Sequence, residues 1–376
     1  MERDVKQFMS KLRAFLSRKN VTLSLRRYGI DALGAMAQGL FCTLLVGTIL
    51  NTIGQQLNIG FLNDVIVTVK QGSNEIAYTV GDLASALVGP GIAVAIGFAL
   101  QAPPLVLFSL IVVGFSANAM GGAGGPLAVY VIALIACECG KLVSKETKID
   151  ILVTPTVTIL IGVATARLVA APIGAAASAV GDFVKWATVL QPFWMGMLVS
   201  VVIGIALTLP ISSAAICAAL GLTGLAGGAA VAGCCAQMVG FAVMSFKENR
   251  WGGLVAQGVG TSMLQMPNIV KNPKIWIPPT LASAITGPLA TCLFRLEMNG
   301  APVSSGMGTC GFVGQIGVYT GWISDVSGGA KDAITVMDWI GLVLICFVLP
   351  AALSVLFCEI LRKIGWIREN DLKLDL

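Results

Sequence analysis

The sequence predicts an all-α polytopic membrane protein with about ten transmembrane helices and two re-entrant hairpins. Of its 376 residues, 56% are hydrophobic and only 11% are charged, whereas a soluble chain carries roughly 25% charged residues. Its 44 glycines are typical of helices that pack closely through small residues. Apolar runs of helix length alternate with short polar or glycine-rich links, and a membrane β-barrel would instead show short alternating segments.

Histidine is absent from the chain, which excludes histidine bases, phosphohistidine within this chain and histidine metal ligands. Most of the ten cysteines lie in apolar runs, where free cysteine acts as a small hydrophobe. The close pairs Cys137 and Cys139, and Cys234 and Cys235, lack the spacing of a zinc site. We therefore expect no metal, no cofactor and no catalytic residue, and an intramembrane enzyme is poorly supported.

The first 27 residues predict an amphipathic interfacial helix. Apolar residues recur there at three- and four-residue spacing. The segment contains eight Lys or Arg but only two acids, Glu2 and Asp4. This excess of positive charge indicates a cytoplasmic N-terminus. The first span follows at 32–53, and residues 58–82 predict an external β-hairpin with its turn at Gln71 to Asn74.

Three spans are expected next, at 84–100, 105–120 and 126–140, with tight breaks at a Pro pair and at a glycine-rich turn. Lysines at 141, 145 and 148 indicate a cytoplasmic loop.

Arg167 lies within the fifth expected span, 151–175. An intramembrane charge suggests function, and Glu138 is its nearest candidate partner. Alternatively, Arg167 extends to the outer interface.

No charge occurs between Lys185 and Lys247, and the Gly/Ala-rich stretch 211–246 is too short for two spans. We therefore expect a re-entrant hairpin followed by one span, with Ser212 and Ser213 facing inward where the hairpin begins.

Two polar, broken segments, 258–279 and 298–322, are the centre of the functional prediction. Four prolines interrupt the first segment and seven glycines loosen the second. Broken backbone with unpaired amides and hydroxyls is tolerated at membrane depth chiefly where it lines a cavity. An aqueous loop is the alternative for 258–279. The predicted solute-binding residues are Ser212, Ser213, Thr261, Ser262, Gln265, Asn268, Asn272, Asn299, Ser304, Ser305 and Gln315.

An external loop and a last span at 339–360 follow, and basic residues place the C-terminus in the cytoplasm. A weak internal duplication is also visible. Segments 118–141 and 221–247 each run from a glycine-rich turn through an apolar helix with close cysteines to a lysine. Net charge of +5 fits contact with anionic lipid, and nucleic acid is not an expected partner.

The sequence Asn272-Pro-Lys-Ile-Trp-Ile-Pro-Pro279, after a polar segment, resembles the signature of enzyme IIC, the membrane subunit of bacterial phosphotransferase sugar transporters. The chain is similar to the branch that includes perfringolysin O regulator-type proteins. This resemblance implies a multi-pass homodimer in the bacterial cytoplasmic membrane, with elevator-type movement. By this similarity 1–27 is the interfacial helix, 28–191 the scaffold, 192–325 the transport region, and 326–376 the last helix and tail.

The chain also departs from that family. Sugar-phosphorylating members have a glutamate-proline about a dozen residues before the asparagine-proline, and a histidine elsewhere that helps to hold the sugar. Thr261 or Ser262 occupies the glutamate position here, and no histidine exists. A carboxylate accepts hydroxyl protons with charge-assisted strength, whereas these neutral groups make bonds roughly half as strong.

Two functions follow as hypotheses. The first is a carrier for a small polar solute, with a carbohydrate as the candidate solute and soluble phosphotransferase subunits as further candidate partners. The second is a membrane sensor that keeps the carrier fold and signals through a cytoplasmic partner, with the basic N-terminal helix as its contact.

Overall fold

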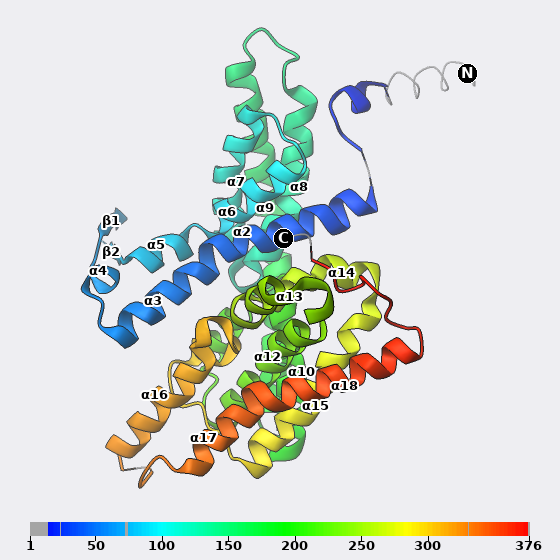
Figure 1. The fold of residues 1–376 in the computed structure, drawn as a ribbon. Coiled ribbons are helices and arrows are strands. Elements are labelled where there is room, and N and C mark those ends of the chain that lie inside the picture. The colour runs from blue at the N-terminus through cyan, green and yellow to red at the C-terminus, as the bar shows by residue number, and fades with distance from the viewer. Residues whose placement is uncertain (1–13, 23, 72–73, 330, 375–376) are drawn as a thin grey trace. The chain divides into compact units, whose positions relative to one another are not determined.

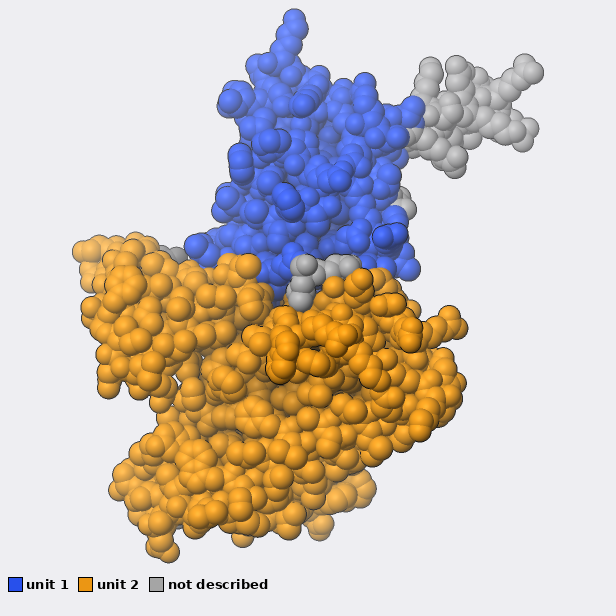
Figure 2. All heavy atoms as spheres, in the orientation of Figure 1, with its two compact units in different colours: residues 1–40, 87–174 blue, residues 41–86, 175–376 orange. Residues whose placement is uncertain are grey.

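The computed structural model describes residues 14–22, 24–71, 74–329 and 331–374, which are mainly helical (Figure 1). Two compact units form, one from residues 1–40 and 87–174 and the other from residues 41–86 and 175–376 (Figure 2). The predicted N-terminal amphipathic helix falls largely on residues 1–13, outside the described residues, although residues 14–18 are helical.

Unit 1 is built from helices of the N-terminal half of the chain. Its elements are η1 (Arg27–Asp31), α2 (Ala32–Leu40), α6 (Val88–Ala99), α7 (Pro104–Gly121), η3 (Gly122–Gly124), α8 (Gly125–Val143) and the first part of α9 (Asp150–Ala187). The η labels mark short 3₁₀ or π-helical turns.

Small residues let the helices of unit 1 approach closely. A Cβ atom added at Gly89 of α6 would lie 2.3 Å from the carbonyl oxygen of Gly114 of α7. Helices α7 and α8 pack side by side, joined by a turn in which Gly122 has a φ of 51°. The predicted glycine-rich break between two spans is therefore confirmed.

Arg167 does not pair with Glu138. The Glu138 carboxylate instead binds Lys141, with Nζ and Oε2 3.0 Å apart, whereas Arg167 is exposed on α9. Three residues along a helix place two side chains on one face, so Lys141 reaches Glu138 within α8 itself. The candidate pairing of Arg167 with Glu138 was therefore wrong.

The loop between α8 and α9 is tied to the N-terminal segment. Lys19 and Arg18 both bind Glu146, and Arg18 does so at 2.8 Å. The hydrogen bond from Lys19, with the two positive charges, holds the pKa of Glu146 below its usual range. One exposed cation, Arg18, and one largely buried cation, Lys19, thus fix the loop.

Unit 2 begins with a small hairpin region and continues into a helical bundle. Its first elements are η2 (Phe41–Leu45), α3 (Val46–Leu57), α4 (Gly60–Asn63), β1 (Val67–Gln71), β2 (Asn74–Tyr78), α5 (Val80–Ala86), the end of α9, α10 (Pro192–Thr208), α11 (Ser213–Ala219), α12 (Gly224–Met244), α13 (Phe246–Val255) and η4 (Ala256–Gly260). Strands β1 and β2 pair antiparallel, with Val67 opposite Tyr78, which confirms the predicted hairpin.

The remaining elements of unit 2 alternate short turns with longer helices. They are η5 (Ser262–Gln265), α14 (Met266–Lys271), η6 (Pro273–Trp276), α15 (Ile277–Pro288), η7 (Leu289–Leu293), η8 (Pro302–Gly306), η9 (Cys310–Phe312), α16 (Val313–Ser327), α17 (Val336–Val343), η10 (Leu344–Val348) and α18 (Leu349–Lys363). The segment 258–279 is broken as predicted. In the segment 298–322 the break ends at Phe312, because residues from Val313 onward form α16.

Helix α12 is the axis of unit 2. It contacts α10, α15, α18, η4, η5, η8 and η10, and almost all of its residues are buried. Glycines permit this packing, since a Cβ atom at Gly233 would lie 1.8 Å from the carbonyl oxygen of Ser200 on α10.

Among the described residues, five helices are long and apolar enough to span a membrane, and one bent helix pair raises the number to six. Within 211–246, the only such helix is α12, preceded by the seven-residue α11. This confirms that the stretch holds one span rather than two. The protein is therefore a helical membrane protein.

Candidate functional site

The broken segment after α13 owes its shape to proline and threonine. Thr261 is extended, with φ −159° and ψ 142°, and separates η4 from η5. Pro267 and Pro273 lie in the first turns of α14 and η6, where a missing N–H leaves no hydrogen bond unmade. The chain therefore restarts a helix twice within a few residues.

Three of the predicted site residues use a side-chain oxygen as a helix cap. Ser212 Oγ accepts from Ala215 N at 3.1 Å, Thr261 Oγ1 accepts from Met263 N at 3.1 Å, and Asn272 Oδ1 accepts from Lys274 N at 3.2 Å. Such caps satisfy amide groups that the first turn of a helix leaves free. These oxygens hold the breaks in place.

Gln257, Gln265 and Asn268 form a buried amide cluster. Gln265 Nε2 donates to Gln257 Oε1 at 2.8 Å, and Asn268 Nδ2 donates to Gln265 Oε1 at 2.9 Å. All three side chains are buried. Gln257 also donates to Ser245 Oγ at 2.9 Å, which places the cluster beside the C-terminal end of α12.

A second group of hydrogen bonds, the central network, surrounds Gln237 of α12. Trp276 Nε1 donates to Gln237 Oε1 at 3.0 Å and Thr208 Oγ1 donates to the same oxygen at 3.3 Å. Gln237 Nε2 donates to Thr280 Oγ1 at 3.3 Å. Ser262 and Thr208 share a hydroxyl–hydroxyl bond of 2.8 Å, which joins the first broken segment to the end of α10.

The second broken segment packs against the same part of α12. Gln315 Nε2 lies 3.1 Å from Cys235 Sγ, and Gln315 Oε1 is buried without a hydrogen-bond partner among the described residues. Gly308 has a φ of 53°, and a Cβ there would lie 2.6 Å from Cys234 Cβ. Glycine at this position thus lets the backbone rest on the helix.

Serine hydroxyls donate hydrogen bonds to the backbone of this segment. Ser213 Oγ donates to Gly306 O at 2.7 Å and Ser305 Oγ donates to Pro302 O at 2.7 Å. Ser304 is buried beside them. Because Thr208 holds Ser262 while Ser213 holds Gly306, the short link between α10 and α11 joins the two broken segments. Turns η4 and η9 also contact each other.

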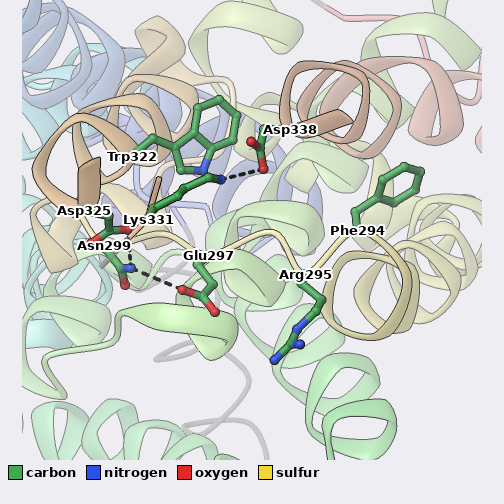
Figure 3. A pocket seen from close by; sticks show the side chains of 8 residues that line it. All are labelled: Phe294, Arg295, Glu297, Asn299, Trp322, Asp325, Lys331 and Asp338. Carbon is green, nitrogen blue, oxygen red and sulfur yellow. Dashed lines mark hydrogen bonds and ion pairs between the residues drawn. The ribbon is translucent and has the colours of Figure 1, made fainter. Parts of the chain in front are cut away.

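Asn299 lies apart, in a charged pocket of about 300 Å³ (Figure 3). Asn299 Nδ2 donates to Asp325 Oδ2 at 2.8 Å, and its Oδ1 accepts from Gly224 N at 3.1 Å, at the start of α12. Lys331 binds Asp338 at 2.7 Å. The pocket lining consists of Phe294, Arg295, Glu297, Asn299, Trp322, Asp325, Lys331 and Asp338.

The predicted residues therefore separate into three levels along α12. Asn299 is at its N-terminal end, and Gln265, Asn268 and Asn272 lie past its C-terminal end. Ser262 and Gln315 sit near its middle. Because α12 has 21 residues, its ends are about 30 Å apart at about 1.5 Å per residue. One solute of the size of a sugar cannot touch all three levels.

Sequence reasoning missed Thr208, Gln237, Gln257, Trp276 and Thr280. A signal existed for Gln237, because it is the one amide side chain in a helix of otherwise small or apolar residues. The hydrogen-bond partners of the Gln237 side chain come from α10, η6 and α15. No pattern in the sequence near Gln237 predicts these long-range pairings. Within the described ranges, no group of three or more His, Cys, Asp or Glu side chains is arranged to hold a metal ion.

A bundle with broken helices and a neutral buried network around one axial helix is the architecture of a membrane carrier for a polar solute. The family model described as "Phosphotransferase system, EIIC" matches residues 30–374. The chain therefore belongs to the enzyme IIC family of the phosphotransferase system, the sugar-transporting membrane subunits. Searches of curated proteins and of solved structures each return no significant match.

Proposed function

We propose that this protein carries a sugar or sugar-like metabolite across the bacterial cytoplasmic membrane, by an elevator-type movement of the elements that hold the central network. The observation that carries this proposal is the buried, neutral hydrogen-bonding level at the middle of α12, where Gln315 Oε1 has no partner among the described residues. Gln315 reaches α12 at Cys235, two residues before Gln237 in the chain, and Ser262 of the other broken segment is joined to Gln237 through Thr208.

Hydroxyl and carboxamide groups suit a carbohydrate. Each sugar hydroxyl can donate and accept a hydrogen bond, and so can each Ser, Thr and Gln side chain of the central network. A neutral network can exchange one hydrogen bond for another at little net cost, since typical bonds contribute about 0.5–1.5 kcal/mol. Such a site favours release as readily as binding, which a carrier needs.

The residues of this chain bind and release the sugar but do not transfer a phosphoryl group. No histidine occurs among the 376 residues, and within the described part of the chain no carboxylate is hydrogen-bonded to the central network. Any phosphorylation of the sugar therefore requires a soluble phosphotransferase subunit, which would meet the carrier on its cytoplasmic side. The ten-helix topology, the homodimer, the scaffold at 28–191 and the transport region at 192–325 are parts of this proposal that come from family resemblance.

Sugar binding to Gln315→Leu tests the proposal. Purified protein in detergent is screened by calorimetry against hexoses and disaccharides, and uptake into proteoliposomes is measured without a phosphoryl donor. Gln315→Leu should weaken binding about fivefold, because it removes a hydrogen bond of about 1 kcal/mol to a neutral hydroxyl. Ser262→Ala should act in the same direction.

Asn299→Ala is the matched control, because Asn299 lies at the far end of α12 and in the charged pocket. Its sugar affinity should equal that of the native chain. Unchanged affinity in both Gln315→Leu and Ser262→Ala, with a native melting transition, would show that the central network is not the sugar site.

A further inference from the structure

The C-terminal tail occupies the amide cluster. Gln265 Nε2 donates to the carbonyl oxygen of Leu372 at 3.0 Å, and Asn268 Nδ2 donates to that of Lys373 at 2.8 Å. These are the amide donors that the sequence suggests for a solute. They are used here by a peptide backbone more than one hundred residues away in the chain.

Further contacts hold the tail in place. Asn249 Nδ2 donates to Leu372 O at 2.7 Å, and Asn249 Oδ1 accepts from Leu374 N at 2.8 Å. Asn272 Nδ2 donates to Trp366 O at 2.9 Å. The Lys274 ammonium lies 4.8 Å from the centre of the Trp366 ring.

Between residues 366 and 374, the described part of the tail, two side chains are buried as anchors. Ile367 is 2% exposed and Leu372 is 0% exposed, whereas Arg368, Glu369 and Lys373 face outward. The Lys274 contact and a hydrogen bond from Asn272 Nδ2 to the Asp371 carboxylate at 2.8 Å also hold the tail. The remaining contacts are neutral hydrogen bonds, which sugar hydroxyls or water can replace. A chain end held in this way can leave and return without unfolding the bundle.

We propose that residues 366–374 are a releasable cap, which closes the end of unit 2 beyond Met244 and must leave before a sugar can pass between the central network and the cytoplasm. The proposal builds on the carrier function proposed above. It assigns Gln265, Asn268 and Asn249 a peptide ligand, the tail of the same chain, which competes with solute for their amide groups.

Two full-length variants release the tail without altering the central network. Leu372→Asp places a charge where the main anchor is buried, and Asn249→Ala removes two hydrogen bonds made only to the tail. Hydrogen exchange of the segment 366–374 should rise at least tenfold in both variants, and the initial rate of sugar uptake into proteoliposomes should rise at least threefold. Glu369→Gln is the matched control, because Glu369 is exposed, and it should change neither value.

Faster tail exchange with unchanged or slower uptake would overturn the proposal, since the tail would then be only a structural support. A second measurement does not depend on sugar. A fluorescent peptide with the sequence of residues 366–376 should bind the Leu372→Asp chain, whose own tail is released, at least tenfold more tightly than the native chain. Suppose that neither the native chain nor any variant transports sugar, but the peptide binds Leu372→Asp and fails to bind Leu372→Asp/Asn249→Ala. The carrier function then fails and the peptide site stands. If sugar is transported and the peptide does not bind, the cap fails.

Discussion

Helices α8 and α12 look alike in sequence and differ in what they bury. Each follows a glycine turn with positive φ, at Gly122 and Gly221, carries two close cysteines and is followed or ended by a lysine. The side chain of Lys141 at the end of α8 is 1% exposed, whereas that of Lys247 beyond α12 is 69% exposed. The lysine of the first segment is thus a buried ion and the lysine of the second a solvated one.

The difference shows two ways of satisfying polar groups among apolar helices. In unit 1, Lys141 binds Glu138 at 3.0 Å and the carbonyl oxygen of Leu100 at 3.2 Å. Gln237 carries the only side-chain amide of α12, and this amide makes hydrogen bonds to neutral groups. A buried charge cannot give up its partner without a large penalty, whereas a neutral group can exchange its partner for a solute. The contrast predicts a structural role for the ion pair of α8 and, under the proposed carrier function, solute exchange at α12.

Removing the lysine of the buried pair should have the largest effect. Lys141→Met leaves the Glu138 carboxylate without its counter-ion, which typically costs about 3–5 kcal/mol. The melting transition of the purified protein in detergent should fall accordingly, and sugar affinity of the folded fraction should stay native. Glu138→Gln/Lys141→Met should recover most of the loss, because no buried charge remains.

Lys148→Met is the control for this experiment, since Lys148 is exposed in the loop between α8 and α9. It should melt like the native protein. If Lys141→Met were equally harmless, the pair would contribute nothing and the contrast between the two helices would disappear.

The sequence predicts the breaks in the helices well, because their causes are local. Pro267, Pro273 and the glycines at 121–125 stop or restart a helix wherever they occur. The burial of Lys141 could not be predicted, since its acceptor at Leu100 belongs to another helix. The same holds for Gln265, whose partner is Leu372 in the tail. Contacts over such distances in the chain leave no mark beside either residue.

Replacing the single amide of α12 should have an intermediate effect on stability and a direct effect on function. Gln237→Leu leaves the indole N–H of Trp276 without its acceptor, at a cost of about 1–3 kcal/mol, whereas the hydroxyl of Thr208 keeps its bond with Ser262. Sugar binding measured by calorimetry should also weaken about tenfold if the central network holds the sugar.

A matched glutamine is available on α2 in unit 1. Gln38 is exposed, so Gln38→Leu should leave both the melting transition and sugar affinity unchanged. Native sugar affinity in Gln237→Leu would separate the central network from the sugar and leave it a structural role.

Removing the solvated lysine should have the smallest effect. Lys247 Nζ lies 2.8 Å from Glu359 Oε1, but the two side chains are 69% and 44% exposed. Exposed pairs contribute about 0–1 kcal/mol, because water screens the attraction and ordering two long side chains costs entropy. Lys247→Met should therefore lower stability by less than about 1 kcal/mol. The difference should vanish in 1 M salt, where the screening length falls to about 3 Å. A loss as large as that of Lys141→Met, or one that persists in high salt, would mean that the lysine after α12 is buried as deeply as the one at the end of α8.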